Sequence, residues 1–179
     1  FEIIFVDDCS ADQSWEILKG LKNKFSTEVT AIRLSKNYGQ HNGTLCGFSF
    51  AKGEFIITID DDLQTPPGEI NKLIAGYADS GADLVYGFYG DNKHSLIRKL
   101  GSQSLKKSSR LFRKTLEKGS SFRMIRAEVI GKMLSHQAPF IFIDEILQWY
   151  TDDIRLVAVS HEPRKYRKSN YSSRRILGL

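Results

Sequence analysis

Three consecutive carboxylates at positions 60–62 directly follow the apolar run 55–59. Three negative charges within a few ångströms repel one another unless a cation or a bound proton compensates them. Hard oxygen ligands at the end of a strand suit Mg²⁺ or Mn²⁺, which leave coordination positions open for a substrate phosphate. We therefore expect a metal-assisted phosphate site at Asp60, Asp62 and Gln64. The alternative is an acidic loop that only ends the strand, with the following prolines starting the next helix.

Two further pairs of carboxylates follow apolar runs, namely Asp7 and Asp8 after residues 2–6, and Asp144 and Glu145 after residues 140–143. The run before the first pair is rich in β-branched residues, which predicts a strand buried on both faces. The second pair begins a predicted helix, where the macrodipole stabilises carboxylates without any catalytic role. A general base and a helix-start carboxylate therefore both stay open as interpretations of Asp144.

Strands and helices alternate between these carboxylates. The hydrophobic pattern predicts strands at 2–6, 29–34, 54–59, 83–87, 119–125 and 154–159. It predicts helices that begin near residue 14 and then at 42–51, 67–80, 95–112, 126–135 and 146–151, with Gly53 as a left-handed cap. This order is typical of an α/β fold with a mainly parallel sheet and helices on both faces. Because ligands bind at the carboxyl ends of such strands, the first two acidic motifs should meet at one edge.

Length and composition indicate one globular domain. The chain has 179 residues, of which 41% are hydrophobic and 26% charged, which argues against disorder over most of its length. No apolar run approaches the ~20 residues of a membrane helix, so we expect a soluble segment. Phe1 opens directly into strand-like sequence, which suggests a missing first strand and shows no signal peptide. Cys9 and Cys46 lack CxxC spacing, so neither zinc nor a disulfide is indicated.

The excess positive charge is concentrated in the tail. The net charge is +5, and from 161 to 179 Glu162 is the only acid among six lysines and arginines. We expect a folded domain over 1–160 and a basic tail over 161–179. Such a tail is compatible with anionic lipid headgroups, phosphorylated small molecules or nucleic acid. The predicted helix 95–112 also has a basic face, for which simple solvation is the alternative.

No glycine-rich phosphate loop occurs in the sequence, because neither GxxxxGK[ST] nor GxGxxG is present. P-loop nucleotidases and dinucleotide dehydrogenases are therefore disfavoured. Without such a loop, a metal ion and nearby arginines must neutralise a bound diphosphate, which gives the carboxylates at 60–62 a function.

The motifs together resemble the family-2 inverting glycosyltransferases of the GT-A fold. Within that family the chain is similar to the branch of dolichyl-phosphate mannose synthase and the bacterial polyprenyl-phosphate sugar transferases. The matching segments follow the family's order and cover nearly the whole chain: 6–12, 34–41, 59–67, 121–123 and 161–171. A DxD motif by itself is weak evidence, whereas this ordered set is specific.

The resemblance implies a nucleotide-diphospho-sugar donor bound through Mg²⁺ or Mn²⁺. Asp60 and Asp62 would form the DxD motif, with Gln64 as a further metal ligand, and Asp62 would serve catalysis directly. Asp7 and Asp8 would contact the nucleoside.

The same resemblance also implies roles for several arginines and for residues of the tail. Arg123 would contact a phosphate of the donor or of the acceptor, and Arg98 is a second candidate for that contact. Arg164 and Ser169 would lie on a loop that closes over the site. Arg167 departs from the glycine of many relatives.

Asp61 is a further departure, since it replaces the small residue common in the middle of the motif. Relatives in this branch often continue into membrane helices beyond the equivalent of residue 179. The resemblance and the basic tail thus imply a membrane surface, at the cytoplasmic face of a bacterial inner membrane, and are compatible with an oligomer.

The class of acceptor determines whether the site needs a general base. A phosphate monoester has a second pKa of about 6, so it is largely ionised near neutral pH and needs little help from a base. A sugar hydroxyl needs a base, for which Asp144 or Glu145 is the candidate. We expect transfer to an undecaprenyl- or dolichyl-type phosphate, with transfer to a saccharide hydroxyl in cell-surface polysaccharide synthesis as the alternative.

Two other protein classes are less consistent with the sequence. A phosphoacceptor receiver domain shares the acidic ending of residues 4–8 but has a single aspartate after its third strand, where this chain has 60–62. A nucleic-acid binder would rest on the basic tail and its tyrosines alone. We therefore expect no nucleic-acid partner.

Overall fold

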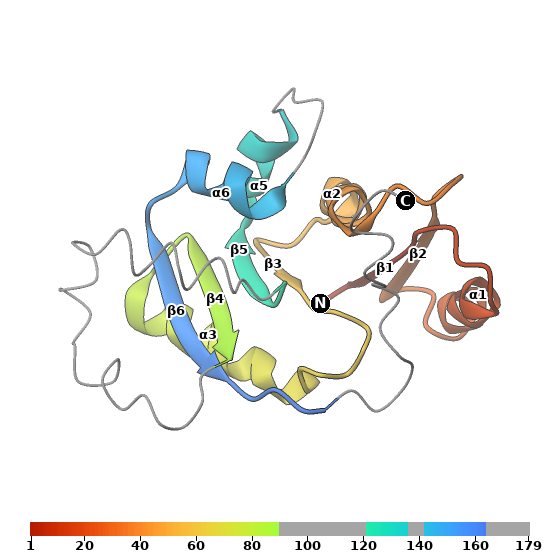
Figure 1. Ribbon diagram of the computed structural model, residues 1–179, viewed down its shortest axis with the longest axis horizontal. Helices are drawn as coiled ribbons and strands as arrows, with labels where there is room; N and C mark the ends of the chain where they lie inside the picture. The colour runs from red at the N-terminus through yellow and green to blue at the C-terminus, as the bar shows by residue number, and fades with distance from the viewer. Residues whose placement is uncertain (90–120, 136–141, 164–179) are drawn as a thin grey trace, which may run out of the picture.

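The computed structural model describes residues 1–89, 121–135 and 142–163. In chain order their elements are β1 (Ile3–Asp7), α1 (Ser14–Lys24), β2 (Val29–Arg33), α2 (Gln40–Phe50), β3 (Phe55–Thr58), the 3₁₀ helix η1 (Pro67–Glu69), α3 (Ile70–Ser80), β4 (Leu84–Tyr89), β5 (Arg123–Arg126), α5 (Ala127–Leu134), α6 (Ile143–Tyr150) and β6 (Ile154–Val159) (Figure 1). The α/β class expected from the alternating pattern is confirmed. The predicted basic helix at 95–112 lies outside the described residues.

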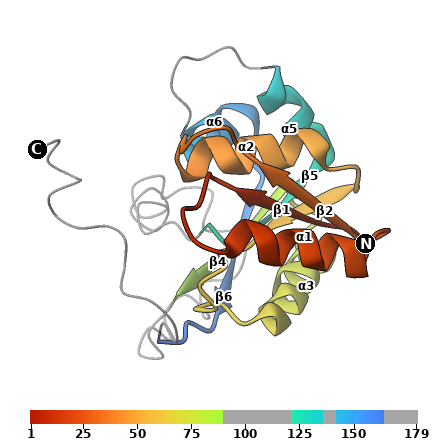
Figure 2. The same cartoon turned by 90° about the vertical axis from the view of Figure 1, so that its right-hand side faces the viewer.

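The strands form two sheets. β1 and β2 pair in parallel, and α1 packs against β2 while α2 packs against β1 (Figure 2). The second sheet has the order β3-β5-β4-β6, in which β4 and β6 are parallel and β5 is antiparallel to both β3 and β4. The sheet is therefore mixed at β5, whereas a mainly parallel sheet was expected. β5 lies between two strands that run in the same direction and are joined through α3.

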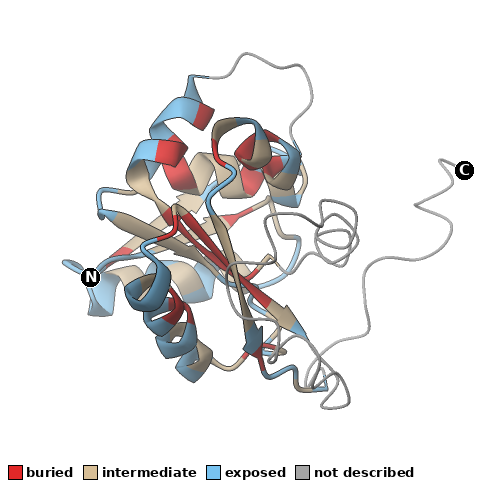
Figure 3. Cartoon of the chain, turned by 90° about the vertical axis from the view of Figure 1, so that its left-hand side faces the viewer, coloured by how far each residue is buried: buried red, intermediate tan, exposed pale blue. Residues whose placement is uncertain are grey.

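Helices cover both faces of the four-stranded sheet. Because side chains alternate along a strand, Leu84 and Tyr86 of β4 point to one face and Val85 to the other. The first face packs against α5 and α6 and the second against α3, and buried positions gather along the strands between them (Figure 3). The buried apolar side chains of these helices are Val129, Ile130, Met133, Ile143, Ile146 and Leu147 on the first face and Leu73 on the second.

One glycine within α3 and one directly after it allow the helix to pack closely and to end. A Cβ at Gly76 would lie 2.5 Å from Cγ2 of Val157 in β6, so only glycine allows the helix to approach the sheet this closely. Gly81 ends the helix with a φ of 66°, in the left-handed region that glycine adopts without strain.

Some predicted features differ in the structure. β1 is half-buried rather than buried on both faces, and Ile3 is 41% exposed, because β2 is the strand that pairs with it among the described residues. α2 runs from Gln40 to Phe50 and is followed by Ala51 in an extended conformation, so Gly53 is not its left-handed cap. In the described part of the chain, no helix has the length and apolar character needed to cross a membrane.

Candidate functional site

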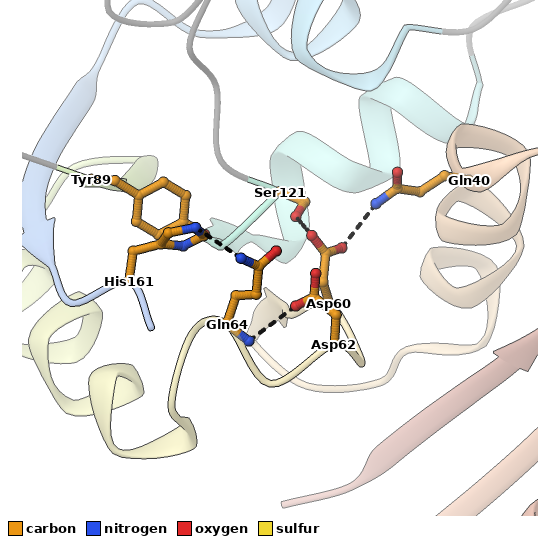
Figure 4. Close-up of a pocket in the computed structure, with 7 residues that line it drawn as sticks. All are labelled: Gln40, Asp60, Asp62, Gln64, Tyr89, Ser121 and His161. Atoms are coloured by element: carbon orange, nitrogen blue, oxygen red, sulfur yellow. Dashed lines mark hydrogen bonds between the residues drawn. The ribbon is translucent and has the colours of Figure 1, made fainter. Parts of the chain in front are cut away.

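A polar pocket lies beyond the carboxyl ends of β3, β4 and β6. Its lining residues come from five segments: Gln40, Asp60, Asp62, Gln64, Tyr89, Ser121 and His161 (Figure 4). Gln40 begins α2, the loop after β3 supplies three residues, and Ser121 precedes β5. The structure thus brings together the three predicted metal ligands, Asp60, Asp62 and Gln64.

Asp60 is oriented by two neutral donors. Nε2 of Gln40 donates to Oδ1 over 2.8 Å, and the hydroxyl of Ser121 donates to Oδ2. Ser121 is itself held by Thr58, whose hydroxyl donates to the Ser121 carbonyl oxygen. Because both donors are neutral, they orient the Asp60 carboxylate without neutralising its charge.

Asp62 shapes the loop that carries the pocket residues. Its Oδ1 accepts a hydrogen bond of 3.1 Å from the backbone N–H of Gln64. Leu63, between them, has a φ of 58° in the left-handed region, which is uncommon for a residue with a side chain. Cys9, directly after the first acidic pair, has the same φ of 58°. Both acidic motifs therefore turn sharply at the residue after their last aspartate.

Gln64 faces the two carboxylates. Its amide nitrogen lies 3.1 Å from Nε2 of His161 and 3.4 Å from the carbonyl oxygen of Glu162. In Figure 4 the amide oxygen lies on the side of Asp60 and Asp62. Three oxygen-bearing side chains therefore converge on one region of the pocket.

This donor set fits a divalent cation with a substrate ligand. Among the described residues, no three His, Cys, Asp or Glu side chains are close enough to hold a metal by themselves. Mg²⁺ is commonly held by one or two carboxylates together with substrate phosphates and water. Asp60, Asp62 and the amide oxygen of Gln64 supply such a partial set of hard ligands.

The first acidic pair is joined to this pocket through residues 37–40. The two oxygens of Asp8 accept N–H hydrogen bonds of 2.7 Å from Tyr38 and 2.8 Å from Gly39, the residues directly before Gln40. Asp7 is 4% exposed and lies 3.3 Å from Nε of Arg33. The two acidic motifs are thus connected through residues 38–40, whereas, among the described strands, β1 and β3 belong to different sheets and share no sheet edge. Contact of Asp7 and Asp8 with a nucleoside stays a prediction.

Arg123 and Asp144 form a separate, more buried cluster. The Arg123 side chain is 3% exposed and pairs with Oδ1 of Asp144, which also accepts a 2.7 Å hydrogen bond from the Tyr86 hydroxyl. Burial raises the pKa of Tyr86 far above its ordinary value, so this hydroxyl remains a donor at neutral pH. Neither Arg123 nor Asp144 lines the pocket, and their predicted roles with phosphate and with a hydroxyl acceptor stay predictions.

Four residues that line the pocket were not predicted as site residues from the sequence, namely Gln40, Tyr89, Ser121 and His161. Three of them lie inside the ordered segments 34–41, 121–123 and 161–171, which was the available signal. Arg98, Arg164 and Ser169 lie outside the described residues.

Sequence comparisons identify related proteins over the whole chain. The model of glycosyl transferase family 2 matches residues 1–134. An undecaprenyl-phosphate 4-deoxy-4-formamido-L-arabinose transferase of Klebsiella pneumoniae is 34% identical over 184 residues, which cover 100% of this chain and 55% of that protein. The transferase of the same name from Yersinia pestis is 34% identical over 181 residues, with the same coverage. The chain therefore spans about half the length of these relatives.

Solved structures share the fold. Residues 1–349 of S. aureus TarS superpose with a TM-score of 0.60 and 20% identity, covering 90% of this chain and 49% of that one. The same protein in complex with UDP-GlcNAc gives a TM-score of 0.61 and 19% identity, covering 97% and 51%. At this level of identity the likeness confirms the GT-A fold.

Proposed function

The chain belongs to glycosyl transferase family 2, and we propose that the protein transfers a sugar from a nucleotide-diphospho-sugar to a polyprenyl phosphate. The observation that carries this proposal is the match of the whole chain to transferases named for undecaprenyl phosphate, at 34% identity. The UDP-GlcNAc complex of a protein with the same fold supports a nucleotide-sugar donor.

We assign the donor diphosphate to the pocket beyond β3. Asp60, Asp62 and the amide oxygen of Gln64 would hold Mg²⁺ or Mn²⁺ there. A bound divalent cation stabilises the charge that develops on the departing nucleoside diphosphate. Gln40 and Ser121 would hold the Asp60 carboxylate in place through their hydrogen bonds. Orienting donors of this kind preserve ligand geometry before substrate arrives.

The carboxylates that line the pocket are more consistent with a phosphate acceptor than with a hydroxyl acceptor. Among the described lining residues the acidic side chains are Asp60 and Asp62, which we assign to the cation. An acceptor hydroxyl would need a further base, whereas an ionised phosphate oxygen attacks the anomeric carbon without one. The reaction would be an in-line displacement that inverts the anomeric centre.

Transfer to a saccharide hydroxyl is the second candidate, and Asp144 is the residue that favours it. Its side chain is 33% exposed and lies in the first turn of α6. One of its oxygens, however, is engaged by Tyr86 and Arg123. Asp144 would have to act through its other oxygen.

The deciding experiment is a donor screen on the full-length protein with Mn²⁺, offering undecaprenyl phosphate and saccharides as acceptors. We expect lipid-linked product, and product with saccharides alone would overturn the proposal. Asp62→Asn should abolish metal-dependent donor binding while the circular dichroism spectrum stays unchanged. Asp61→Asn is the matched control, since this neighbouring carboxylate does not line the pocket.

We further propose that the basic tail binds an anionic membrane surface at the cytoplasmic face. The six lysines and arginines after residue 163 are the support for this. Co-sedimentation of the full-length protein with vesicles containing phosphatidylglycerol should fall when these residues are changed to glutamine. Equal binding by both forms would contradict a role for the tail.

A further inference from the structure

We infer that His161 is a positioning residue that aims the amide oxygen of Gln64 at the cation. The inference rests on the proposed function, because it concerns the same metal site. It assigns a role to the segment that directly follows β6, which approaches the pocket from the side opposite Gln40 (Figure 4).

The first step concerns the orientation of the Gln64 amide. The carbonyl oxygen of Glu162, 3.4 Å away, is only an acceptor, so the group that faces it must be the amide nitrogen. The same nitrogen lies 3.1 Å from Nε2 of His161. Since an amide nitrogen only donates, Nε2 of His161 accepts and the ring proton is on Nδ1. Both amide hydrogens are thus directed at residues 161 and 162, and the amide oxygen is directed toward the carboxylates.

The second step concerns the position of the His161 ring. It packs against the ring of Tyr89 with centroids 4.1 Å apart and an interplanar angle of 46°. The Tyr89 hydroxyl forms a 2.8 Å hydrogen bond with Thr65, which is 5% exposed. The His161 ring, which accepts the Gln64 hydrogen bond, therefore packs against Tyr89. Tyr89 is in turn hydrogen-bonded to the loop after β3.

The third step concerns the backbone around His161. The N–H of Glu162 donates to the carbonyl oxygen of Gln64 over 2.7 Å, and the N–H of Ser160 donates to Glu69 over 2.8 Å. His161 is thus held on both sides against the loop that carries the proposed ligands. A residue that is held rigidly and hydrogen-bonds to a flexible metal ligand fixes the orientation of that ligand. Loss of such a hydrogen bond commonly lowers metal affinity about 10–100-fold.

The experiment measures Mn²⁺ binding to the full-length protein by electron paramagnetic resonance, with uridine diphosphate present as the probe. His161→Phe keeps a ring against Tyr89 but removes the acceptor, and we expect about tenfold weaker Mn²⁺ binding. His161→Gln returns an acceptor oxygen at a similar reach and should recover most of that loss. Thermal unfolding of both variants should match the parent protein.

A double variant tests whether His161 acts through Gln64. Gln64→Ala alone should weaken Mn²⁺ binding, and His161→Phe added to it should cause no further loss. An additive loss, or a nitrogen coupling from an imidazole in the Mn²⁺ spectrum, would make His161 a direct ligand and overturn the positioning role.

The two remaining outcomes separate this inference from the proposed function. If Gln64→Ala weakens Mn²⁺ binding while His161→Phe does not, the metal site stands and the inference is wrong. If Gln64→Ala binds Mn²⁺ as the parent does, Gln64 is not a ligand, and the inference is overturned together with that part of the proposed function.

Discussion

Gln40 donates a 2.8 Å hydrogen bond to Asp60, although 20 residues separate them in the sequence. The two residues directly before Gln40 donate their N–H groups to Asp8. One short segment at the start of α2 therefore connects the acidic motif after β1 with the acidic motif after β3. The position of Asp60 depends on how Asp8 holds this segment.

This relationship predicts a specific loss on changing Gln40 to alanine. Removing one hydrogen bond to a charged group costs about 1.5–3 kcal/mol, so we expect kcat/KM to fall about ten- to a hundredfold. Ser49→Ala is the control, because Ser49 lies on the same helix and bonds only within it, to the carbonyl oxygen of Cys46. Equal kcat/KM values for the two variants would show that Gln40 does not orient Asp60.

The ion pair between buried Arg123 and partly exposed Asp144 predicts a stability effect. Asp144→Ala leaves the Arg123 guanidinium buried without its partner, which should lower the free energy of unfolding by about 3 kcal/mol, the low end for breaking a buried pair. Tyr86→Phe removes only a hydroxyl from the same cluster and should cost about 1 kcal/mol. Urea unfolding monitored by circular dichroism measures both. A smaller loss for Asp144→Ala than for Tyr86→Phe would contradict a structural role for the pair.

Local patterns predicted most of the elements because helix and strand periodicities are properties of short segments. β6 has the predicted bounds, 154–159, and α5 differs from its predicted range by one residue at each end. The placement of β5 between β3 and β4 could not be predicted in this way. Strand pairing depends on residues far apart in the chain, and the chain direction of a short apolar run leaves no mark in its composition.

The residues of the site also divide into those that the local sequence predicts and those that depend on distant partners. Asp60 and Asp62 were predictable because three adjacent carboxylates need a compensating partner. His161 and Gln40 were not, since each is an ordinary surface residue until its partner across the fold is known. Contact of Arg123 with a phosphate stays a prediction, and its ion pair with Asp144, 21 residues away, was not predicted. The partner of a buried arginine depends on residues far along the chain, which its own segment does not reveal.

Two helical glycines predict opposite responses to alanine. At Gly76 the added Cβ meets Val157 at 2.5 Å, so Gly76→Ala should lower the free energy of unfolding by about 1–3 kcal/mol. At Gly131, in α5, nothing lies within 4 Å of the added Cβ. Gly131→Ala should therefore raise the free energy of unfolding by up to about 1 kcal/mol, the difference in helix propensity. Chemical denaturation of the pair checks this, and a loss of similar size in both would contradict the close approach of α3 to β6.

The left-handed conformation of Leu63 predicts an unusual tolerance of glycine. Leu63 is 45% exposed, and glycine adopts its φ of 58° freely, so Leu63→Gly should change the free energy of unfolding by less than about 1 kcal/mol. Leu63→Val places a β-branched side chain in the same conformation, where it is more crowded than leucine, and should lower the free energy of unfolding. Ile74→Gly is the control, because Ile74 is 47% exposed but helical, and it should lose about 1 kcal/mol. A larger loss of stability for Leu63→Gly than for Ile74→Gly would contradict the left-handed conformation of Leu63.

Glu69 predicts the direction of a pH dependence. Partial burial raises the pKa of this carboxyl, but hydrogen bonds from Lys72 and from the N–H of Ser160 outweigh it, so the pKa lies below its ordinary value of 4.5. A carboxyl whose pKa is lower in the folded state stabilises the fold above its unfolded pKa and loses that contribution as the pH falls through the folded pKa. The stabilising contribution of Glu69 should thus be complete at pH 7 and should disappear on acidification below about pH 4.5.

Glu69→Gln removes this titration. At pH 7 the variant should be less stable by about 1.5–3 kcal/mol, the range for hydrogen bonds to a charged group, and the difference from the parent protein should shrink as the pH falls from 5 to 3. Glu16→Gln is the matched control, because Glu16 also pairs with a lysine three residues away, Lys19, but is 68% exposed. Such an exposed pair contributes under about 0.5 kcal/mol, so this variant should follow the parent protein at every pH. Urea unfolding across this range measures both variants, and a Glu69→Gln difference that stays constant down to pH 3 would show that Ser160 and Lys72 do not hold the charged form.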